Sequence, residues 1–364
     1  MRQGATLDGW IFFAVFTLLG IGVVMVLSTS YLYAEERFLD GFYFFRKQMI
    51  AVGLGLTALC VCVVLPLAAL RRLNLALLGL ALLTLVLVLV PGVGVARGGA
   101  QRWLPLAGFS FQPAEFAKLA LIVYMADSLA RKGTKVETFK FGVLPYLIVG
   151  GLFLALIVLE PDLGASFVLG LILFFMLFIA GVRVGHLLCL IAAAMPLLAL
   201  VILGAPYRVQ RLMAFFDPWK EPEKGGFQMI QSFIAFGSGQ LWGRGLGESR
   251  QKLFYLPEAH TDFIFSVIGE ELGLVGALTV LGLFGVIIVR GFRLAAQIED
   301  PFGQYLAFGL TALLGLQASI HMAVVMGLVP TKGLVLPFIS YGGSAMVVNL
   351  TAAGMLLNLS RRRT

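Results

Sequence analysis

Charged residues, cysteine and histidine are all scarce in this sequence. Asp, Glu, Lys and Arg together make up 13% of the 364 residues, whereas hydrophobic residues make up 60%. Soluble domains are about half apolar and about one quarter charged. The composition therefore excludes a soluble globular protein. It predicts an all-α polytopic membrane protein, because a helix satisfies its own backbone hydrogen bonds inside a bilayer.

The three cysteines give no sign of a disulfide or a metal site. Cys60, Cys62 and Cys189 all lie in apolar runs, and the sequence has only three histidines. Cys60 and Cys62 are two positions apart, so a helix would point them to different faces. We expect all three cysteines to be buried packing residues, and we predict no metal site built from side chains.

Long apolar runs recur along the whole chain. A helix needs about 20 apolar residues to cross a bilayer. The sequence therefore predicts a single membrane domain of ten transmembrane helices, at residues 9–29, 48–66, 73–91, 113–130, 143–159, 164–181, 185–204, 263–289, 303–326 and 343–360. A long loop, residues 205–261, separates the seventh span from the eighth.

The distribution of Lys and Arg indicates the orientation. With ten spans both termini share one side, and that side carries as many basic loop residues as the other in less than half the length. Dense basic loops are typical of the cytoplasmic side. We expect cytoplasmic termini and an extracytoplasmic loop 205–261. The net charge of +8 favours contact with anionic membrane lipid. It does not indicate nucleic acid, because no hydrophilic basic domain is present.

The most unusual stretch, residues 253–274, reads LFYLPEAHTDFIFSVIGEELGL. It places Glu258, His260 and Asp262 just before a predicted span, and Glu270 and Glu271 inside that span. Ionisable groups at the edge of a membrane or within it are costly and point to function. The stretch is therefore the candidate active site.

Asp262 has two interpretations in this stretch. It could cap the helix that follows, as Asp often does. It could instead be a catalytic group at the outer end of a span. The helical face from Asp262 through Ser266 to Gly273 carries a hydroxyl and glycines, so we expect it to line a cleft.

Two other segments place charges near predicted span ends. Glu115 and Lys118 are three positions apart, close enough to pair on a helix, and could form either a clamp between helices or the wall of a polar cavity. Arg102 stands beside Trp103 and could anchor at the interface or bind phosphate. Asp162, in the segment EPDLGAS, could cap the next helix or contact substrate.

The remaining candidates lie in later loops. Arg208 and Arg211 would share one face of a helix, where they could bind a pyrophosphate or a lipid headgroup. Residues 327–344 read GLVPTKGLVLPFISYGGS, a segment broken by Pro and Gly in which Lys332 is the lone cation and Ser340 a candidate supporting residue. Non-helical backbone at membrane depth lines a cavity or is covered by protein.

Four of these motifs together resemble the SEDS family of cell-wall proteins, the group of FtsW, RodA and SpoVE. They are GAQRWL with FQPAEFAK, EPDLGAS, YLPEAHTDFIFSVIGEELGLVG and PTKGLVLPFISYGGS, in order across nearly the whole chain. The forms LPEAHTDFIF and PTKGL favour the division-type FtsW branch over the elongation-type RodA branch. His321 and Ala345 depart from the usual family pattern, so no role is assigned to either.

The resemblance implies a peptidoglycan glycosyltransferase with ten spans in the bacterial cytoplasmic membrane. It would polymerise lipid II at the outer face, together with a class B penicillin-binding protein and other divisome or elongasome proteins. The family's essential aspartate falls on Asp262, and its Glu/Lys pair falls on Glu115 and Lys118.

We expect Asp262 to act as general base in a single inverting displacement. The candidate contacts for substrate or its pyrophosphate are Arg208, Arg211, Arg102, Lys118, Glu115 and Lys332, and the supporting residues are Glu258, His260, Asp162 and Ser340. No cofactor is required by the sequence, although Mg or Mn could accompany the pyrophosphate. The alternative function is a lipid II flippase that uses the intramembrane charges as a polar path.

Overall fold

The computed structural model describes residues 6–97, 99–106, 109–220, 222, 226–251, 256 and 258–361. Part of the acidic stretch (253–255 and 257), part of the loop 205–261 (221, 223–225 and 252–255) and the terminal Arg362 and Arg363 lie outside the described residues.

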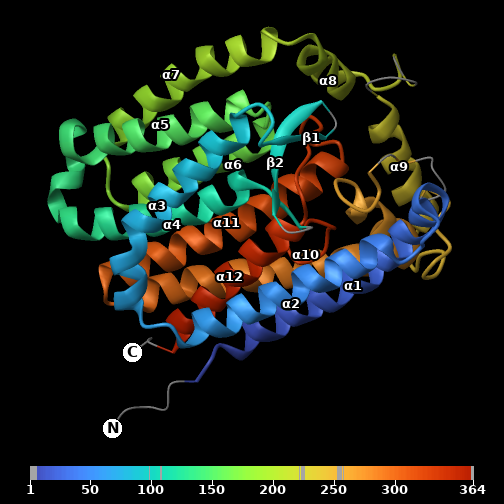
Figure 1. Ribbon diagram of the computed structural model, residues 1–364, viewed down its shortest axis with the longest axis horizontal. Helices are drawn as coiled ribbons and strands as arrows, with labels where there is room; N and C mark the ends of the chain where they lie inside the picture. Colours follow the sequence, from blue (N-terminus) through green and yellow to red (C-terminus); the bar gives the residue numbers. More distant parts are fainter. Residues whose placement is uncertain are drawn as a thin grey trace.

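Helices dominate the structure (Figure 1). Their bounds are α1 (Gly9–Phe38), α2 (Tyr43–Val64), α3 (Leu67–Leu89), α4 (Pro113–Lys132), α5 (Leu144–Leu159), α6 (Leu163–Ile179), α7 (Val184–Leu203), α8 (Pro206–Phe216), α9 (Phe227–Gly239), α10 (Ile264–Gln297), α11 (Pro301–Val325) and α12 (Gly343–Ser360). A 3-10 turn, η1 (Gly133–Glu137), and a π-helical turn, η2 (Phe139–Val143), connect α4 to α5.

Each of the ten predicted spans overlaps one of these helices. Within the described residues, eight helical segments are long and apolar enough to cross a membrane, the fourth of them being η2 together with α5. α6 is shorter, at 17 residues, and α4 carries five charged residues, which lowers its hydropathy. The chain is therefore a multi-pass membrane protein. Its first and last helices meet at one end of the bundle, where the Asp8 amide donates to Ser360 Oγ at 3.0 Å.

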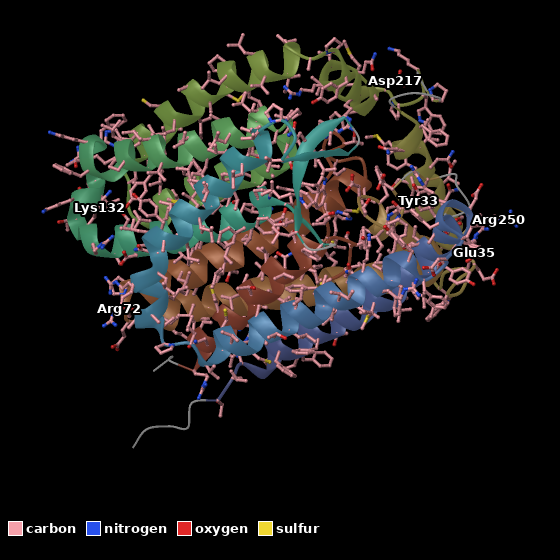
Figure 2. All side chains as sticks on the ribbon, in the orientation of Figure 1. Tyr33, Glu35, Arg72, Lys132, Asp217 and Arg250 are labelled. Carbon is pink, nitrogen blue, oxygen red and sulfur yellow. The ribbon has the colours of Figure 1, made fainter. Side chains whose placement is uncertain are left out.

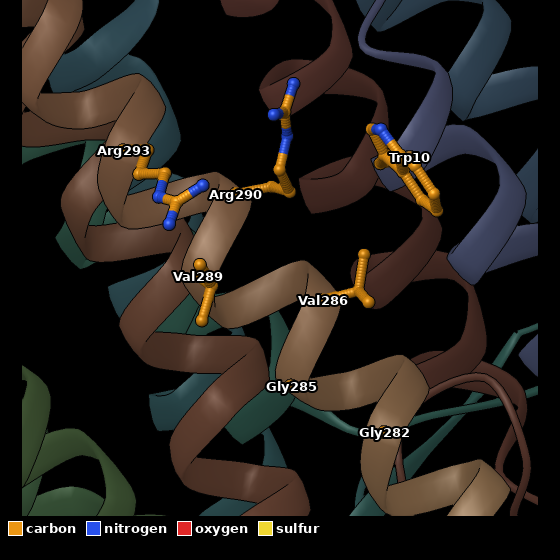
Figure 3. A pocket seen from close by; sticks show the side chains of 7 residues that line it. All are labelled: Trp10, Gly282, Gly285, Val286, Val289, Arg290 and Arg293. Atoms are coloured by element: carbon orange, nitrogen blue, oxygen red, sulfur yellow. The ribbon is translucent and has the colours of Figure 1, made fainter.

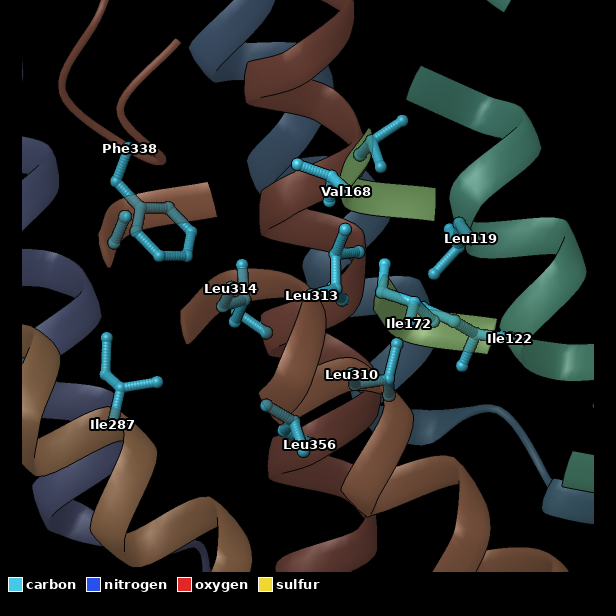
Figure 4. Close-up of a cluster of buried hydrophobic side chains, with 14 of the residues drawn as sticks. Leu119, Ile122, Val168, Ile172, Ile287, Leu310, Leu313, Leu314, Phe338 and Leu356 are labelled. Atoms are coloured by element: carbon cyan, nitrogen blue, oxygen red, sulfur yellow. The ribbon is translucent and has the colours of Figure 1, made fainter. Parts of the chain in front are cut away.

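The centre of the bundle is formed by α11 and α12, which are buried along most of their length. Leu310, Leu313 and Leu314 of α11 pack in a cluster with Ile122 of α4 and Ile172 of α6 (Figure 4). These apolar contacts hold α4, α6 and α11 together. The loops that carry the candidate site residues therefore rest on a rigid base.

A small antiparallel sheet departs from the all-α prediction. It consists of β1 (Val95–Arg97), β2 (Ala100–Leu106) and β3 (Phe109–Phe111) in the order β1-β2-β3. The strands are short and pair only with their neighbours in the chain, so they leave little periodic pattern in the sequence. The sheet places Arg102 and Gln112 at the edge of the bundle interior.

Helix α7 lies at the periphery, yellow-green in Figure 1. Leu187 is its only buried residue. An apolar helix with so little packing fits a lipid environment on one side. Its other side faces a large cavity that is described below.

Helix α10 is broken at Gly273, whose φ of 67° and ψ of −165° are not helical. A neighbouring loop, residues 240–245, forms the backbone hydrogen bonds that the helix loses at the break. The amides of Leu274 and Val275 donate to the carbonyls of Gln240 and Leu241, at 2.9 and 3.2 Å. In the other direction, the amides of residues 244 and 245 donate to the carbonyls of Glu270 and Glu271. The span predicted as one continuous helix is thus two helical pieces joined through a loop.

The prediction that the face from Asp262 through Ser266 to Gly273 lines a cleft is confirmed for Asp262, which lines the cavity described below, and is wrong for Ser266 and Gly273. Helix α9 covers the face beyond Asp262: Ser232 Oγ lies 2.8 Å from Ser266 Oγ, and a methyl group on Gly239 would meet the carbonyl of Gly269. Small residues on both helices allow this close approach. Their function is packing between α9 and α10.

The prediction that all three cysteines are buried is also wrong. Cys62 is buried, but Cys60 and Cys189 are exposed on α2 and α7. Both exposed cysteines lie on apolar helices that a bilayer would cover. An apolar run in the sequence does not show whether a residue in it faces the protein interior or the lipid.

Candidate active site

A cavity of about 1980 Å³ lies beside the start of α10. One part of its lining is polar and includes Lys47, Arg102, Asp162, Arg208, Arg211, Glu258, His260, Asp262 and Lys332. The other part is apolar and comes from α5, α6 and α7, with residues such as Leu154, Phe174 and Leu198. The cavity can therefore hold a molecule with a charged head and a hydrocarbon tail.

Asp262 sits in the turn that leads into α10. Its amide donates to the carbonyl of Glu258 at 3.1 Å, as does the amide of Thr261. The N-cap position of α10 is Phe263, and no side chain caps the helix. The capping alternative for Asp262 therefore fails. Among the described residues its carboxylate accepts no hydrogen bond, so both oxygens are free to act on a ligand.

Burial sets the acidity of this carboxylate. It raises the pKa of Asp262 to about 7, and the negative charge of Glu258 adds to the rise, while the guanidinium of Arg211 opposes it. A carboxylate with a pKa near the working pH is a stronger base than an ordinary Asp and is still partly ionised. The site thus contains a carboxylate whose pKa is in the range that a general base needs at neutral pH.

His260 is held in an aromatic cage. Its ring lies 4.8 Å from that of Phe44 and 5.6 Å from those of Tyr33 and Tyr341, centroid to centroid. Burial lowers the pKa of His260, although the nearby charge of Glu258 opposes this. A neutral, caged ring fixes the turn that carries Asp262.

The loop between α11 and α12 holds the same turn from the other side. Ser340 Oγ donates to the carbonyl of Thr261 at 2.7 Å and accepts from the amide of Leu336 at 2.8 Å. The amide of Tyr341 donates to the carbonyl of His260 at 2.9 Å. Ser340 therefore supports the turn from behind and does not line the cavity.

Lys332, from the same loop, projects into the cavity. Its ammonium lies 3.6 Å from the centre of the Phe167 ring. Burial lowers the pKa of Lys332 to about 8. The side chain is thus a cation at neutral pH that an anionic group could bind.

Arg102 reaches from β2 to the turn between α5 and α6. Its guanidinium donates to the carbonyl of Glu160 at 3.1 Å and to that of Pro161, and lies 3.9 Å from Asp162 Oδ2. Asp162 caps α6 by accepting from the amide of Ala165 at 2.9 Å. The structure therefore shows the capping role that was predicted as one alternative for Asp162. Arg102 and Asp162 lie next to each other in the lining of the cavity.

Glu160, in this turn, is fully buried, and its carboxyl accepts no hydrogen bond among the described residues. Burial and the charge of Asp162 raise the pKa of Glu160 to about 8. Glu160 is therefore protonated at neutral pH.

Arg208 and Arg211 lie on α8 and face the cavity from the long loop. Both stack near the ring of Tyr207, and Arg208 also donates to the carbonyl of Val201 at 2.7 Å. Arg211 is close enough to Asp262 to influence its pKa. Of the two, Arg211 is better placed to contact a ligand that is also held by Asp262.

Glu115 and Lys118 do not reach the cavity. The Lys118 ammonium is fully buried and donates to Glu115 Oε1 at 2.7 Å, and Gln317 of α11 donates to the other carboxylate oxygen at 3.3 Å. The geometry favours the alternative of a clamp between α4 and α11. A role in contacting substrate remains only a prediction.

Glu270 and Glu271 likewise hold parts of the protein together. The hydroxyl of Ser28 in α1 donates to the carboxylate of Glu271 and lies 2.8 and 2.9 Å from its two oxygens. Glu270 accepts from Ser249 and from the amides of residues 250 and 251. These acids stabilise the broken helix and do not line the cavity.

Sequence reasoning missed several lining residues. Tyr33, Phe44, Lys47 and Tyr341 all face the cavity. The segment FYFFRK at the start of α2 could have indicated some of them, because it gathers aromatics and cations at a span end. Figure 2 places Tyr33 with Glu35 and Arg250 at one end of the bundle, and Arg72 and Lys132 at the other.

The described residues contain no cluster of three or more His, Cys, Asp or Glu side chains that could hold a metal ion.

Fold and site together define a class: a multi-pass membrane protein with a free carboxylate and several cations at the polar end of a large amphipathic cavity. The chain belongs to the FtsW, RodA and SpoVE family of cell cycle proteins, whose family model matches residues 9–364. The predicted family is thereby confirmed.

Curated relatives of this chain include proteins from two named groups of the family. The probable peptidoglycan glycosyltransferase FtsW of Geobacter sulfurreducens is 47% identical over 341 residues, 94% of this chain and 91% of the relative. The stage V sporulation protein E of Bacillus subtilis is 41% identical over 345 residues, 94% of each chain.

Solved structures are similar over nearly the whole chain. The rod shape determining protein RodA of Thermus thermophilus superimposes with a TM-score of 0.73 at 28% identity, covering 98% of this chain and 97% of its own. A chain from a peptidoglycan synthase complex, solved to explain how polymerization and crosslinking are coordinated, gives a TM-score of 0.79 at 29% identity and covers 98% of both chains.

Proposed function

We propose that this protein is a peptidoglycan glycosyltransferase that polymerises lipid II at the outer face of the cytoplasmic membrane, with Asp262 as the general base. The observation that carries the proposal is the free Asp262 carboxylate at the polar end of the cavity. Its pKa of about 7 suits proton transfer at neutral pH. The Geobacter sulfurreducens relative, named a probable peptidoglycan glycosyltransferase, supports the same activity.

The reaction is one inverting displacement. Asp262 takes the proton from the C4 hydroxyl of the terminal GlcNAc of one lipid II as that oxygen attacks the anomeric carbon of a second. The bond from that carbon to the pyrophosphate breaks, and undecaprenyl pyrophosphate leaves. An α-linked donor then gives a β-1,4 product. Pyrophosphate is a good leaving group, so no acid carboxylate is needed opposite the base.

The cations of the cavity stabilise the charge that develops on the pyrophosphate. Lys332 and Arg211 are the best placed, because Lys332 projects into the cavity and Arg211 acts electrostatically on Asp262. Arg208 and Arg102 are partly engaged with backbone carbonyls and would contribute less. The apolar wall from α5, α6 and α7 suits the polyprenyl chain.

The proposal includes ten membrane crossings, cytoplasmic termini and an outward-facing loop 205–261. The Asp8–Ser360 contact supports it by placing α1 and α12 together at one end. The candidate active-site cavity lies beside the start of α10, at the opposite end of the bundle from this contact. We also propose a class B penicillin-binding protein as the partner, in the divisome or elongasome, since one structural neighbour comes from a peptidoglycan synthase complex.

A flippase would need a polar path through the bundle. The four intramembrane groups considered for it, Glu115, Lys118, Glu270 and Glu271, are engaged in separate clamps outside the cavity. The decisive assay uses purified protein in detergent, with its transpeptidase partner and fluorescent lipid II. Glycan polymer is expected. Absence of polymer, together with movement of lipid II across vesicles, would favour the flippase.

A further inference from the structure

A second cavity, of about 410 Å³, lies at the opposite end of α10 from Asp262. Figure 3 shows its lining, one residue of α1 and six of α10: Trp10, Gly282, Gly285, Val286, Val289, Arg290 and Arg293. None of these residues takes part in the site described above.

Its depth along α10 places it in a headgroup layer. Arg290 lies 26 residues beyond Ile264, and the two helical pieces of α10 that meet at Gly273 would together span roughly 39 Å if they were collinear, at 1.5 Å per residue. A bilayer with its headgroups is about 40–45 Å thick. If Asp262 lies at one surface of the membrane, the guanidinium groups of Arg290 and Arg293 therefore lie close to the other.

The cavity carries one uncompensated positive charge. Arg290 is paired with the buried Asp8, whose Oδ2 accepts from its guanidinium at 2.5 and 3.1 Å. Asp8 is further occupied as the N-cap of α1, accepting from the amides of Trp10 and Ile11. Arg293 is exposed and has no ion-pair partner among the described residues. A ligand with a single negative charge matches this arrangement.

The shape below the charges is a groove. A methyl group added to Gly282 or Gly285 would meet nothing within 4 Å, so the surface of α10 is open there. Val286 and Val289 make its sides apolar. Trp10 is 61% exposed across from them, and tryptophan prefers the level of the headgroups. The groove therefore runs from a cationic rim towards the interior of the membrane.

We propose that this cavity binds an anionic phospholipid of the cytoplasmic leaflet, with Arg293 and the free edge of Arg290 on the headgroup phosphate and an acyl chain along Gly282 and Gly285. Basic pockets on helix surfaces at the cytoplasmic side are typical sites for such headgroups. A packed protein helix would have to desolvate the unpaired Arg293, which is costly. A free phosphate would leave the apolar groove empty.

The bound lipid would join two helices that already meet through Asp8 and Arg290. It would lie between Trp10 of α1 and Arg293 of α10 and thus reinforce the end of the bundle where the termini lie. We therefore expect anionic phospholipid to raise the thermal stability of the protein, in addition to binding it.

The test uses the purified full chain in detergent, with phosphatidylglycerol and phosphatidylcholine of identical acyl chains as probes. Native mass spectrometry measures the lipid retained, and thermal unfolding measures the stabilisation. Arg293→Gln removes the free charge, whereas Gly285→Leu fills the groove and leaves both arginines in place. Arg72→Gln, which removes an exposed arginine outside the cavity, is the matched control.

The proposal predicts that the parent retains more phosphatidylglycerol than phosphatidylcholine. Arg293→Gln should lower the retention of phosphatidylglycerol about fivefold, and Gly285→Leu should lower it as well. Arg72→Gln should match the parent. Equal retention of both lipids, or a loss in Arg72→Gln as large as in Arg293→Gln, would overturn the proposal. So would stabilisation by inorganic phosphate alone, or a dimer that disappears in Gly285→Leu.

Discussion

The carboxylate of Asp262 lies against the backbone of Gly333: a methyl group at residue 333 would stand 3.0 Å from Asp262 Oδ2. The turn that carries the base and the loop that carries Lys332 are therefore fitted to each other. The absence of a side chain at Gly333 sets where the carboxylate can lie.

Gly333→Ala should accordingly impair catalysis by displacing Asp262. The carboxylate would have to shift by a few tenths of an ångström. Because a misplacement of about 1 Å can cost up to roughly a hundredfold in rate, we expect a loss of about three- to tenfold in lipid II polymerisation with little change in thermal stability. Gly170→Ala is the control, because its methyl group would make only an ordinary contact, 3.9 Å from Leu154, in the same cavity. Equal activity of both variants would show that the contact with Gly333 does not position the base.

The pH dependence of kcat/KM should follow the ionisation of two groups, Asp262 and Lys332. Asp262 acts as a base only when ionised, so kcat/KM should rise with pH through its pKa of about 7. Lys332 must be charged to help the leaving group, so kcat/KM should fall as pH rises through its pKa of about 8. The expected profile is a narrow bell.

Two variants assign the limbs of that bell. The charge of Glu258 raises the pKa of Asp262, so Glu258→Gln should move the acidic limb to lower pH. Lys332→Arg keeps the charge at all accessible pH values and should remove the alkaline limb. A profile that neither variant alters would contradict both assignments.

The buried pair of Glu115 and Lys118 should behave as a structural clamp. Lys118→Met leaves an unpaired buried carboxylate, a change that costs about 3–5 kcal/mol in comparable sites. The double variant Glu115→Met with Lys118→Met removes both charges and should recover most of the lost stability. Thermal unfolding in detergent measures both. A double variant that is stable but inactive would contradict the assignment of the pair as a purely structural clamp.

The repaired break in α10 gives a prediction about glycine. Gly243 has a φ of 80°, and a methyl group there would lie 2.2 Å from the carbonyl of Glu271. Gly243→Ala should therefore separate the loop from the helix and lower the unfolding temperature markedly. Gly237→Ala is the control, since a methyl group on α9 at that position meets nothing within 4 Å. Similar unfolding temperatures of the two variants would mean that the loop accommodates the methyl group and still binds α10, contrary to the prediction.

Local signals in the sequence predicted much of the framework. Ten apolar runs fall on ten helices, Pro113 begins α4 as its ring geometry allows, and Asp162 caps α6. Each of these features depends on residues adjacent in the chain. Asp262, Arg211 and Lys332, which are candidates because each is an ionisable residue near a predicted span end, line one cavity.

Features that depend on distant contacts could not be predicted. The break at Gly273 exists because residues 240–245 supply its hydrogen bonds. The face through Ser266 is covered because α9 approaches it, and Glu115 faces Gln317 instead of the cavity. In each case a polar or small residue was correctly recognised as significant, but its partner lay far away in the sequence.

The most direct test of the account is the rate at which Asp262→Asn, in complex with the cognate transpeptidase, polymerises labelled lipid II. Asn keeps the shape of the side chain and removes its basicity, so the account predicts a loss of about a hundred- to ten-thousandfold, with lipid II still bound. Glu258→Gln, a neighbouring carboxylate in the same cavity, should retain most of the activity at its own pH optimum. Polymerisation by Asp262→Asn at close to the parent rate would contradict the assignment of Asp262 as the base.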